Sequence, residues 1–372
     1  MGEWANARIL TPVIGYDMKF WQFILLLVLV SVSIVLIKGD RLVTIAERTT
    51  QNSLDFANRE DIRIVVISDL NSQYGSTEYE PEIDKAIALI PQWQPDLVLC
   101  GGDMIAGQKR SLTQAQIEAM WSAFDAHVAL PLREMKIPFG FTIGNHDGSG
   151  AIVKSELIFA NERELASAYW NDPQHEPGLN FIDRANFPFY YSFQSGDIFF
   201  LVWDASTHNI DDRQLAWVEQ SLASQIAQQA KMRMAIGHLP LYPVAAKKNK
   251  PGEYLAKAEK LRSLLEKEEV HTYISGHHHA YYPGKKGQLQ LLHAGALGQG
   301  SRQLIGSNLP PRQTITIVDI KLYTAETTYT TYDIKTMELI EIEQLPQRID
   351  GDNGFILRRD IINSQSPIPN PK

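Results

Sequence analysis

The chain has 372 residues, of which 44% are hydrophobic and 21% are charged, and its formal net charge at pH 7 is -8. This composition is typical of a folded protein with a sizeable core, and the length allows one large domain or two smaller ones. The negative charge argues against non-specific nucleic-acid binding, which needs a basic face that displaces counterions. Because Cys100 is the only cysteine, an internal disulfide and a multi-cysteine zinc site are both excluded.

The first predicted element is an apolar segment near the N-terminus. Residues 21–37, WQFILLLVLVSVSIVLI, form an uninterrupted apolar run between Lys19 and Lys38, and about 17 to 25 such residues cross a bilayer. A cleaved signal peptide is the alternative reading, but no small-residue cleavage site follows. The sequence therefore favours a transmembrane anchor over residues 18–38. Basic residues are divided too evenly between its two sides to predict an orientation.

The segments around this anchor complete the predicted organisation. A methionine opens the anchor, which suggests that residues 1–17 come from an upstream misassigned start. Residues 39–59 are polar and charged, as in a linker. The main domain is expected over residues 60–335, and residues 336–372 are expected to form a C-terminal extension that ends in a disordered tail.

Five predicted strands of the main domain share one form. Each begins with an apolar, partly β-branched run and ends in Gly or Ser followed by Asp, Asn or His. A buried strand delivers polar side chains into the loop at its carboxyl end in this way. The five stretches are DIRIVVISDLN (61–71), PDLVLCGGDM (95–104), PFGFTIGNHD (138–147), KMRMAIGHLP (231–240) and VHTYISGHH (270–278).

Helical patterns lie between these strands and indicate an α/β fold. They cover residues 81–93, 111–130, 213–231 and 254–269. A hairpin over residues 187–206, with its turn at Ser195 and Gly196, adds antiparallel strands. Further antiparallel strands are expected at 288–297, 314–323 and 327–335. The sheets are therefore expected to be mixed.

Polar side chains gather at the predicted carboxyl ends of the strands, where open α/β sheets bind their ligands. Alone, each suits a turn, a helix cap or a structural histidine, but five such strand ends in succession indicate a site. Imidazoles together with carboxylates suit zinc, iron or manganese. Three histidines and two aspartates are more ligands than one tetrahedral ion needs. They suffice for two ions that share a carboxylate. The residues are Asp69, Asp103, Asn145, His146, His238, His277 and His279.

Three histidines follow one another in the last of these blocks. If the strand geometry continues through them, His277 and His279 point to one side and His278 to the other. The pattern then predicts two ligands and one bystander.

The blocks SDLN, GGDM, GNHD, GHLP and GHHHA resemble, in order and spacing, the five signature blocks of the calcineurin-like metallophosphoesterase superfamily. The resemblance covers roughly residues 62–300. It implies a four-layer αββα sandwich, in which helices flank two mixed β-sheets, with a binuclear centre of two divalent ions (Mn, Zn or Fe) at the strand ends. The ligands that it implies are Asp103 between the two ions, Asp69 and His279 on one ion, and Asn145, His238 and His277 on the other.

The same resemblance implies that His146 faces the substrate and that Asp147 orients it, with loop capping as the alternative role of Asp147. The first block departs from the family pattern, because Asn71 stands where most members have His. Asn71 is an additional candidate ligand that either coordinates weakly or leaves its position to water. Purple acid phosphatases compensate for this missing His with a Tyr at the position of Ala106, so that branch is disfavoured.

The sequence thus predicts a membrane-anchored, binuclear metal-dependent phosphoesterase. By the resemblance, it would hydrolyse a phosphomonoester or phosphodiester through attack of a hydroxide that bridges the metals. The alternative is a protein of the same fold that has lost turnover and acts as a binding or scaffold protein at the membrane. The expected partners are a phosphoester and the membrane, with the catalytic domain outside the cytoplasm.

Overall fold

The computed structural model describes residues 59–71 and 73–362, and every element below belongs to the unit Arg59–Lys372. The predicted anchor (18–38) and the tail from residue 363 lie outside the described residues. Within the described part of the chain, no helix combines the length and apolar character that crossing a bilayer requires.

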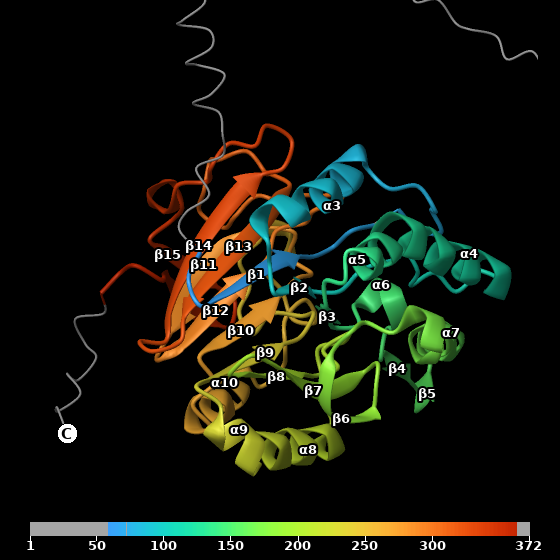
Figure 1. Ribbon diagram of the computed structural model, residues 1–372, viewed down its shortest axis with the longest axis horizontal. Coiled ribbons are helices and arrows are strands. Elements are labelled where there is room, and N and C mark those ends of the chain that lie inside the picture. The colour runs from blue at the N-terminus through green and yellow to red at the C-terminus, as the bar shows by residue number, and fades with distance from the viewer. Residues whose placement is uncertain (1–58, 72, 363–372) are drawn as a thin grey trace, which may run out of the picture. The chain divides into compact units, whose positions relative to one another are not determined.

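One of the two large sheets has five strands in the order β14–β13–β1–β2–β3 (Figure 1). β1, β2 and β3 run parallel, whereas β13 is antiparallel to β1 and β14 is antiparallel to β13. Both faces of β1 and β2 are almost entirely buried, which explains their continuous apolar sequence. The strands are β1 (Ile62–Ile67), β2 (Leu97–Cys100), β3 (Phe139–Phe141), β13 (Thr314–Lys321) and β14 (Glu326–Asp333).

The other large sheet has nine strands in the order β15–β16–β11–β12–β10–β9–β8–β7–β6. Its central strands β8, β9, β10 and β12 are parallel, and antiparallel strands extend both sides. The strands are β6 (Asn180–Asn186), β7 (Tyr190–Ser195), β8 (Ile198–Val202), β9 (Met232–Ile236), β10 (Thr272–Ser275), β11 (Tyr282–Lys286), β12 (Leu289–His293), β15 (Arg348–Gly351) and β16 (Gly354–Arg358). A separate two-stranded hairpin consists of β4 (Ile152–Val153) and β5 (Glu156–Leu157).

The helices begin where the sequence provides caps. α3 has proline in its first turn, and α4 starts with a capping box in which Thr113 and Gln116 each bond to the other's backbone. The longer helices are α3 (Pro81–Trp93), α4 (Gln114–Phe124), α7 (Ala160–Asn171), α8 (Asp212–Leu222) and α10 (Ala258–Lys267). The shorter helical segments are η1 (Asp125–Ala129), α5 (Leu130–Glu134), α6 (Asn145–Gly148), η2 (Pro173–His175), α9 (Gln225–Gln229), η3 (Ala246–Lys248) and η4 (Ile342–Gln344).

Helices pack against both sheets. Trp93 of α3 stacks on Tyr332 of β14, and Phe124 of α4 contacts Phe139 of β3. α8 and α10 contact β8 and β12 of the nine-stranded sheet. The expectation of an α/β fold with two mixed sheets is confirmed.

The two sheets contact each other at Gly140 of β3. A Cβ atom on Gly140 of β3 would lie 2.9 Å from the ring of Phe193 in β7, so glycine allows the sheets to approach closely here. This close packing brings the loops after the parallel strands of both sheets to one region of the molecule.

All five strands that precede the predicted site residues are present, with shorter bounds than the sequence blocks. The hairpin turn lies at Gly196 and Asp197, one residue later than expected, because Ser195 pairs with Ile198. No strand is predicted from the sequence after residue 335. In the structure β15 and β16 form a hairpin whose second strand pairs with β11, so this part of the C-terminal extension completes the nine-stranded sheet.

Candidate metal centre

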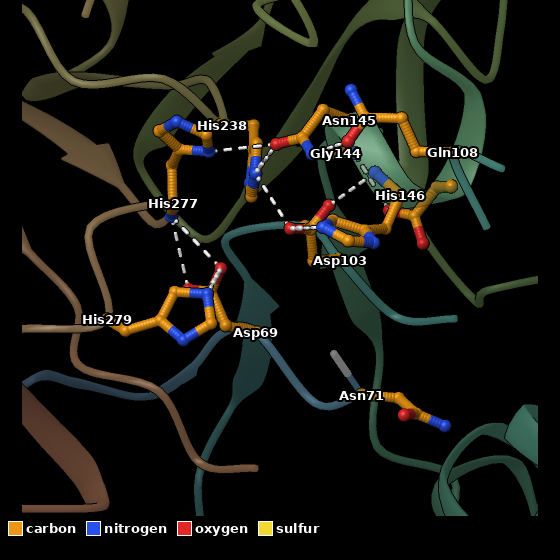
Figure 2. Close-up of polar contacts among 12 residues, drawn as sticks. Asp69, Asn71, Asp103, Gln108, Gly144, Asn145, His146, His238, His277 and His279 are labelled. Atoms are coloured by element: carbon orange, nitrogen blue, oxygen red, sulfur yellow. Dashed lines mark hydrogen bonds and ion pairs between the residues drawn. The ribbon is translucent and has the colours of Figure 1, made fainter. Parts of the chain in front are cut away.

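The predicted site residues come together at the carboxyl ends of strands from both sheets (Figure 2). β1, β2 and β3 of one sheet and β9 and β10 of the other each end within a few residues of one of them. Their side chains are buried or nearly so, and they meet although they are far apart in the chain. The residues brought together are Asp69, Asp103, Asn145, His146, His238, His277 and His279.

Four of these residues adopt the left-handed backbone conformation, which costs a non-glycine residue about 1 kcal/mol or more. Their φ angles are 53° at Asp69, 54° at Asp103, 65° at His277 and 51° at His279. Such strained residues cluster at functional sites because the surrounding structure has to hold them. The sharp turns at these positions direct the side chains toward one another.

Glycines in the sequence blocks leave room for this approach. A Cβ atom on Gly144 would lie 2.1 Å from the carboxylate of Asp103, and one on Gly276 would lie 2.1 Å from Oγ of Ser68. Any larger residue at either position would displace the carboxylate loops. The glycines of GNHD and GHHHA are therefore required by packing around the site.

Two clusters of possible ligands share one carboxylate. Asp103, His238 and His277 offer atoms that all lie within 4.8 Å of one another, and so do Asp69, Asp103 and His279. Oxygen and imidazole nitrogen donors at this spacing suit divalent transition metals. The shared position of Asp103 is the one that a bridging ligand would occupy.

Ion pairs hold Asp103 in the charged form. Burial acts to raise the pKa of Asp103, but His238 and His146 hold it well below its usual range. Nε2 of His238 lies 3.1 Å from Asp103, and the backbone N–H of His146 donates to the same carboxylate at 2.8 Å. Burial opposes the charged form of His238, but Asp103 and Asp69 raise the pKa of His238 to about 9.

The amide of Asn145 is oriented by a residue that the sequence analysis missed. Its Nδ2 donates to Oε1 of Gln108 at 2.7 Å, so its Oδ1 faces the imidazoles of His238 at 3.0 Å and His277 at 2.8 Å. This orientation presents the amide oxygen, the atom that binds cations, to the centre of the site.

Glu253 is a second residue that sequence reasoning missed. Its carboxylate lies 2.9 Å from Nε2 of His277, while Nδ1 of the same ring faces Asn145. A carboxylate behind an imidazole fixes the tautomer and the orientation of a metal-binding histidine. Burial, followed by the charge of Lys248, holds the pKa of His277 well below its usual value. Glu253 lies in an irregular loop, and no motif in the sequence marks it.

His278 is the bystander among the three histidines. The backbone N–H of Val244 donates to its Nδ1 at 3.1 Å, and its Nε2 lies 2.8 Å from the carbonyl oxygen of Glu253. The expected division of the three rings is present, but the expected reason is wrong, because β10 ends at Ser275 and the histidines form a turn.

Asn71 lies apart from the two clusters (Figure 2). Its Nδ2 donates to the carbonyl oxygens of Ser76 and Glu78 at 3.2 Å each, and its Oδ1 accepts from the backbone of Gln73. The side chain therefore stabilises its own loop. Whether Asn71 ligates a metal therefore stays a prediction, with its polar atoms bonded to its own loop here.

Asp147 has the capping role rather than the orienting role. Its carboxylate accepts three backbone N–H bonds, from Met104 at 2.7 Å, Ile105 at 2.9 Å and Gly144 at 2.8 Å. No hydrogen bond between described residues joins Asp147 to the His146 ring. Asp147 therefore stabilises the two loops that carry Asp103 and Asn145.

The ring of His146 is instead in contact with an aromatic side chain. The Tyr74 ring centroid lies 5.0 Å from that of His146, at an interplanar angle of 32°. Within the described residues, Nδ1 of His146 is buried without a hydrogen-bond partner, while Nε2 lies 3.9 Å from Asp103. Burial, which outweighs the nearby carboxylate of Asp103, lowers the pKa of His146.

A large cleft opens beside the two clusters. Its volume is about 880 Å³, and Asn145 and His277 lie in its wall. Lys248 and Lys250 add positive charge to the rim, and Tyr74 forms another part of the wall. The site is thus accessible to a substrate considerably larger than a phosphate ion.

Comparison with known proteins identifies the family. The family described as calcineurin-like phosphoesterase matches residues 62–281, which contain all the clustered residues, and the chain belongs to this family. Its members are usually metal-dependent hydrolases. No curated protein matches the chain.

Solved structures with a similar fold share little sequence with this chain. The GAP50 anchor in the inner membrane complex of Plasmodium is 13% identical, with a TM-score of 0.49, and the match covers 75% of this chain and 87% of that one. A putative 5'-nucleotidase from Staphylococcus aureus is 14% identical, with a TM-score of 0.37 and coverage of 83% and 56%. The phosphoesterase YfcE from E. coli is 11% identical, with a TM-score of 0.30 and coverage of 73% and 100%.

Proposed function

We propose that this protein is a binuclear metal-dependent phosphoesterase that hydrolyses a phosphomonoester or a phosphodiester. The observation that carries the proposal is the pair of buried ligand clusters that share Asp103. Asp69 and His279 would complete one metal site, and Asn145, His238 and His277 the other. These oxygen and nitrogen donors fit two divalent ions, because each cluster combines a carboxylate with imidazole.

Bound divalent ions would supply a water of lowered pKa and positive charge beside the phosphoryl oxygens. In the hydrolysis, the oxygen of water bonds to phosphorus, the bond from phosphorus to the leaving oxygen breaks, and the leaving oxygen gains a proton. We infer that His146 donates that proton or a hydrogen bond, since its ring lies next to Asp103 and packs on Tyr74, which lines the cleft.

The test is hydrolysis of p-nitrophenyl phosphate and bis-p-nitrophenyl phosphate by the full chain, with Mn²⁺ or Zn²⁺ added. We expect metal-dependent turnover that His238→Ala abolishes, while His127→Ala, a change on the surface of the molecule, retains it. Circular dichroism would establish that both variants are folded. A folded wild-type chain that is supplied with metal and hydrolyses neither ester would rule out the hydrolase, and the ratio of the two rates separates monoesterase from diesterase.

A scaffold protein without turnover is the second candidate, and the position of Asn71 favours it. Because Asn71 bonds to its own loop, three protein ligands, Asp69, Asp103 and His279, are left for the first ion. A chain that binds fewer than two ions and hydrolyses no ester would support the scaffold. Recovery of turnover by Asn71→His would show that this position alone had removed the activity.

We also propose that residues 18–38 anchor the chain in a membrane, with the catalytic unit outside the cytoplasm. The apolar run of residues 21–37 supports the anchor, and the charges beside it leave the orientation to experiment. A reporter enzyme that is active only outside the cytoplasm, fused to the C-terminus, should be active in cells. An inactive reporter on a membrane-bound fusion would show that the C-terminus lies in the cytoplasm and would contradict this orientation.

A further inference from the structure

The cleft beside the metal clusters has an apolar wall. β4 and β5 form a short hairpin in which Ile152 pairs with Leu157 and Val153 with Glu156. The two residues of its turn, Lys154 and Ser155, have φ angles of 49° and 68°, the sign that a tight two-residue hairpin turn requires. The hairpin therefore holds its side chains in fixed directions at the rim.

Only one of the two faces of this hairpin contributes side chains to the cleft. Residues paired across antiparallel strands share a face, and both Ile152 and Leu157 line the cleft. They are nevertheless 66% and 38% exposed, so a large part of each side chain is open to solvent. Val153 and Glu156 form the pair on the opposite face.

Tyr74 extends this apolar wall toward the reacting groups. It is 55% exposed, it lines the same cleft, and its ring packs against His146. The hairpin residues, Tyr74 and the candidate ligands Asn145 and His277 therefore line one cleft. Exposed apolar side chains grouped at a concave site mark a surface for an apolar ligand.

The remaining part of the cleft has the opposite character. Lys248 lies 3.4 Å from Nε2 of His277, and Lys250 lines the same cleft. Both lysines pair with Glu253, so two cations face one carboxylate here and an anionic group would be attracted. A cleft with cations and metal ligands in one part and exposed Ile, Leu and Tyr side chains in another is complementary to an amphiphile. Its volume of about 880 Å³ leaves room for a substituent well beyond the phosphoryl group.

We propose that the substrate is a phosphoester with an apolar alkyl or aryl substituent, and that Ile152 and Leu157 bind this substituent. The inference rests on the proposed phosphoesterase function and names the substrate class of that site. Tyr74 contacts the part of the substituent nearest to phosphorus.

The test compares inhibition by methylphosphonate and hexylphosphonate, which carry the same anionic group and differ only in chain length. Inhibition constants are measured on the full chain with Mn²⁺, against whichever p-nitrophenyl ester it hydrolyses. We expect hexylphosphonate to bind at least about tenfold more tightly, since each buried methylene contributes several-fold in affinity. The double variant Ile152→Ser and Leu157→Ser should bring the ratio of the two constants close to one.

Val153→Ser is the matched control, because it makes the same kind of change on the other face of the same hairpin. It should keep the wild-type ratio. All these residues are exposed, so the variants should fold as the wild type does. Equal affinity for the two phosphonates in the wild type, or the same loss in Val153→Ser as in the double variant, would overturn the inference.

Failure of the inferred substrate class can be distinguished from failure of the proposed phosphoesterase function. If the chain hydrolyses no ester, the proposed function fails, but the dissociation constants of the two phosphonates can still be measured by calorimetry on the Mn²⁺-loaded chain. A chain-length preference that depends on Ile152 and Leu157 would then support the apolar site alone. Hydrolysis without that preference would support the phosphoesterase and reject the amphiphilic substrate.

Discussion

At the scale of single residues, His146 lies between a candidate metal ligand and an aromatic ring. Its backbone binds Asp103, its ring packs on Tyr74, and its side chain is 13% exposed. It belongs to neither ligand cluster, and its neighbour Tyr74 lines the cleft. In the proposed function, His146 assists the departure of the leaving oxygen.

We expect His146→Asn to lower turnover by about 10²- to 10⁴-fold on alkyl phosphate esters, whose leaving groups need a proton. The loss should be much smaller on p-nitrophenyl esters, because p-nitrophenolate leaves unaided. Steady-state rates on the two classes of ester measure the difference. An equal loss on both classes, or a loss of bound metal, would show that His146 acts elsewhere.

Glu253 offers a second test at this scale. Its carboxylate lies behind the ring of His277, so Glu253→Gln should weaken metal binding by about 10- to 100-fold. Titration with Mn²⁺, followed by calorimetry, gives the affinity. Glu156→Gln, which removes an exposed carboxylate from the β4–β5 hairpin, should leave it unchanged. Wild-type affinity in Glu253→Gln would mean that this carboxylate does not support the ligand.

The ligand clusters could be predicted from sequence because each member follows a strand within one short block. Asp69 follows β1 of the five-stranded sheet and His277 follows β10 of the nine-stranded sheet, and the backbone N–H of His277 donates to the carboxylate of Asp69. The supporting residues could not be predicted. Glu253 and Gln108 lie in loops whose course depends on the packing of both sheets.

At the scale of elements, a buried ion pair joins the central strand β1 to β13. Nε of Arg63 lies 2.7 Å from the carboxylate of Asp319, and both side chains are about 95% buried. Arg63 also donates to the carbonyl oxygen of Trp93 at the end of α3. Strand, neighbouring strand and helix are therefore connected through one side chain.

We expect Arg63→Ala to lower the free energy of unfolding by about 3–5 kcal/mol, since Asp319 would stay buried without its partner. Urea unfolding followed by circular dichroism provides the measurement. The double variant Arg63→Leu and Asp319→Leu should recover much of the loss. A double variant as unstable as Arg63→Ala would contradict this explanation.

Long amphipathic helices and buried strands could be predicted, and short or irregular elements could not. The bounds of α3 match the predicted segment 81–93, where proline opens the helix and an apolar stripe faces the sheet. The predicted helix over 111–130 is divided by the π-helical turn η1, which ordinary helical spacing does not reveal. β15 and β16 have only four and five residues, and their pairing with β11 depends on a partner far away in the chain.

At the scale of the whole molecule, the buried His293 and the partly buried His271 connect stability to pH. Burial lowers the pKa of His293 to about 3, and burial with the charge of Arg359 lowers that of His271 to about 4. An unfolded histidine titrates near pH 6.5. Above pH 6.5 these two histidines are neutral in both the folded and the unfolded chain. Below that pH they become protonated in the unfolded chain but stay neutral in the folded chain. Stability should therefore fall as the pH decreases from about 6.5 toward the folded pKa values.

We expect His293→Phe to make this decrease shallower by at most about 1.4 kcal/mol per pH unit. The free energy of unfolding, measured in urea at pH 7, 6 and 5, gives the slope. Equal slopes for the wild type and His293→Phe would mean that His293 is protonated in the folded chain.

The site forms where loops from the two sheets meet, so it depends on the fold of the whole molecule. Asp103 follows a strand of the five-stranded sheet and His238 a strand of the nine-stranded sheet, yet they lie 3.1 Å apart. Spacing along the chain could predict neither this distance nor the cleft beside it. The resemblance of the sequence blocks to a family predicted that Asp103 and His238 are ligands of one centre, but it predicted neither the distance nor the cleft.

The central claim is that two ions bind at the site and share Asp103. The most direct measurement is the metal content of the purified full chain, determined by mass spectrometry after incubation with Mn²⁺ and dialysis. We expect two ions per chain in the wild type, one in His238→Ala and fewer than one in Asp103→Ala. A folded wild-type chain that holds one ion or none, or an Asp103→Ala variant that keeps both, would contradict the binuclear centre.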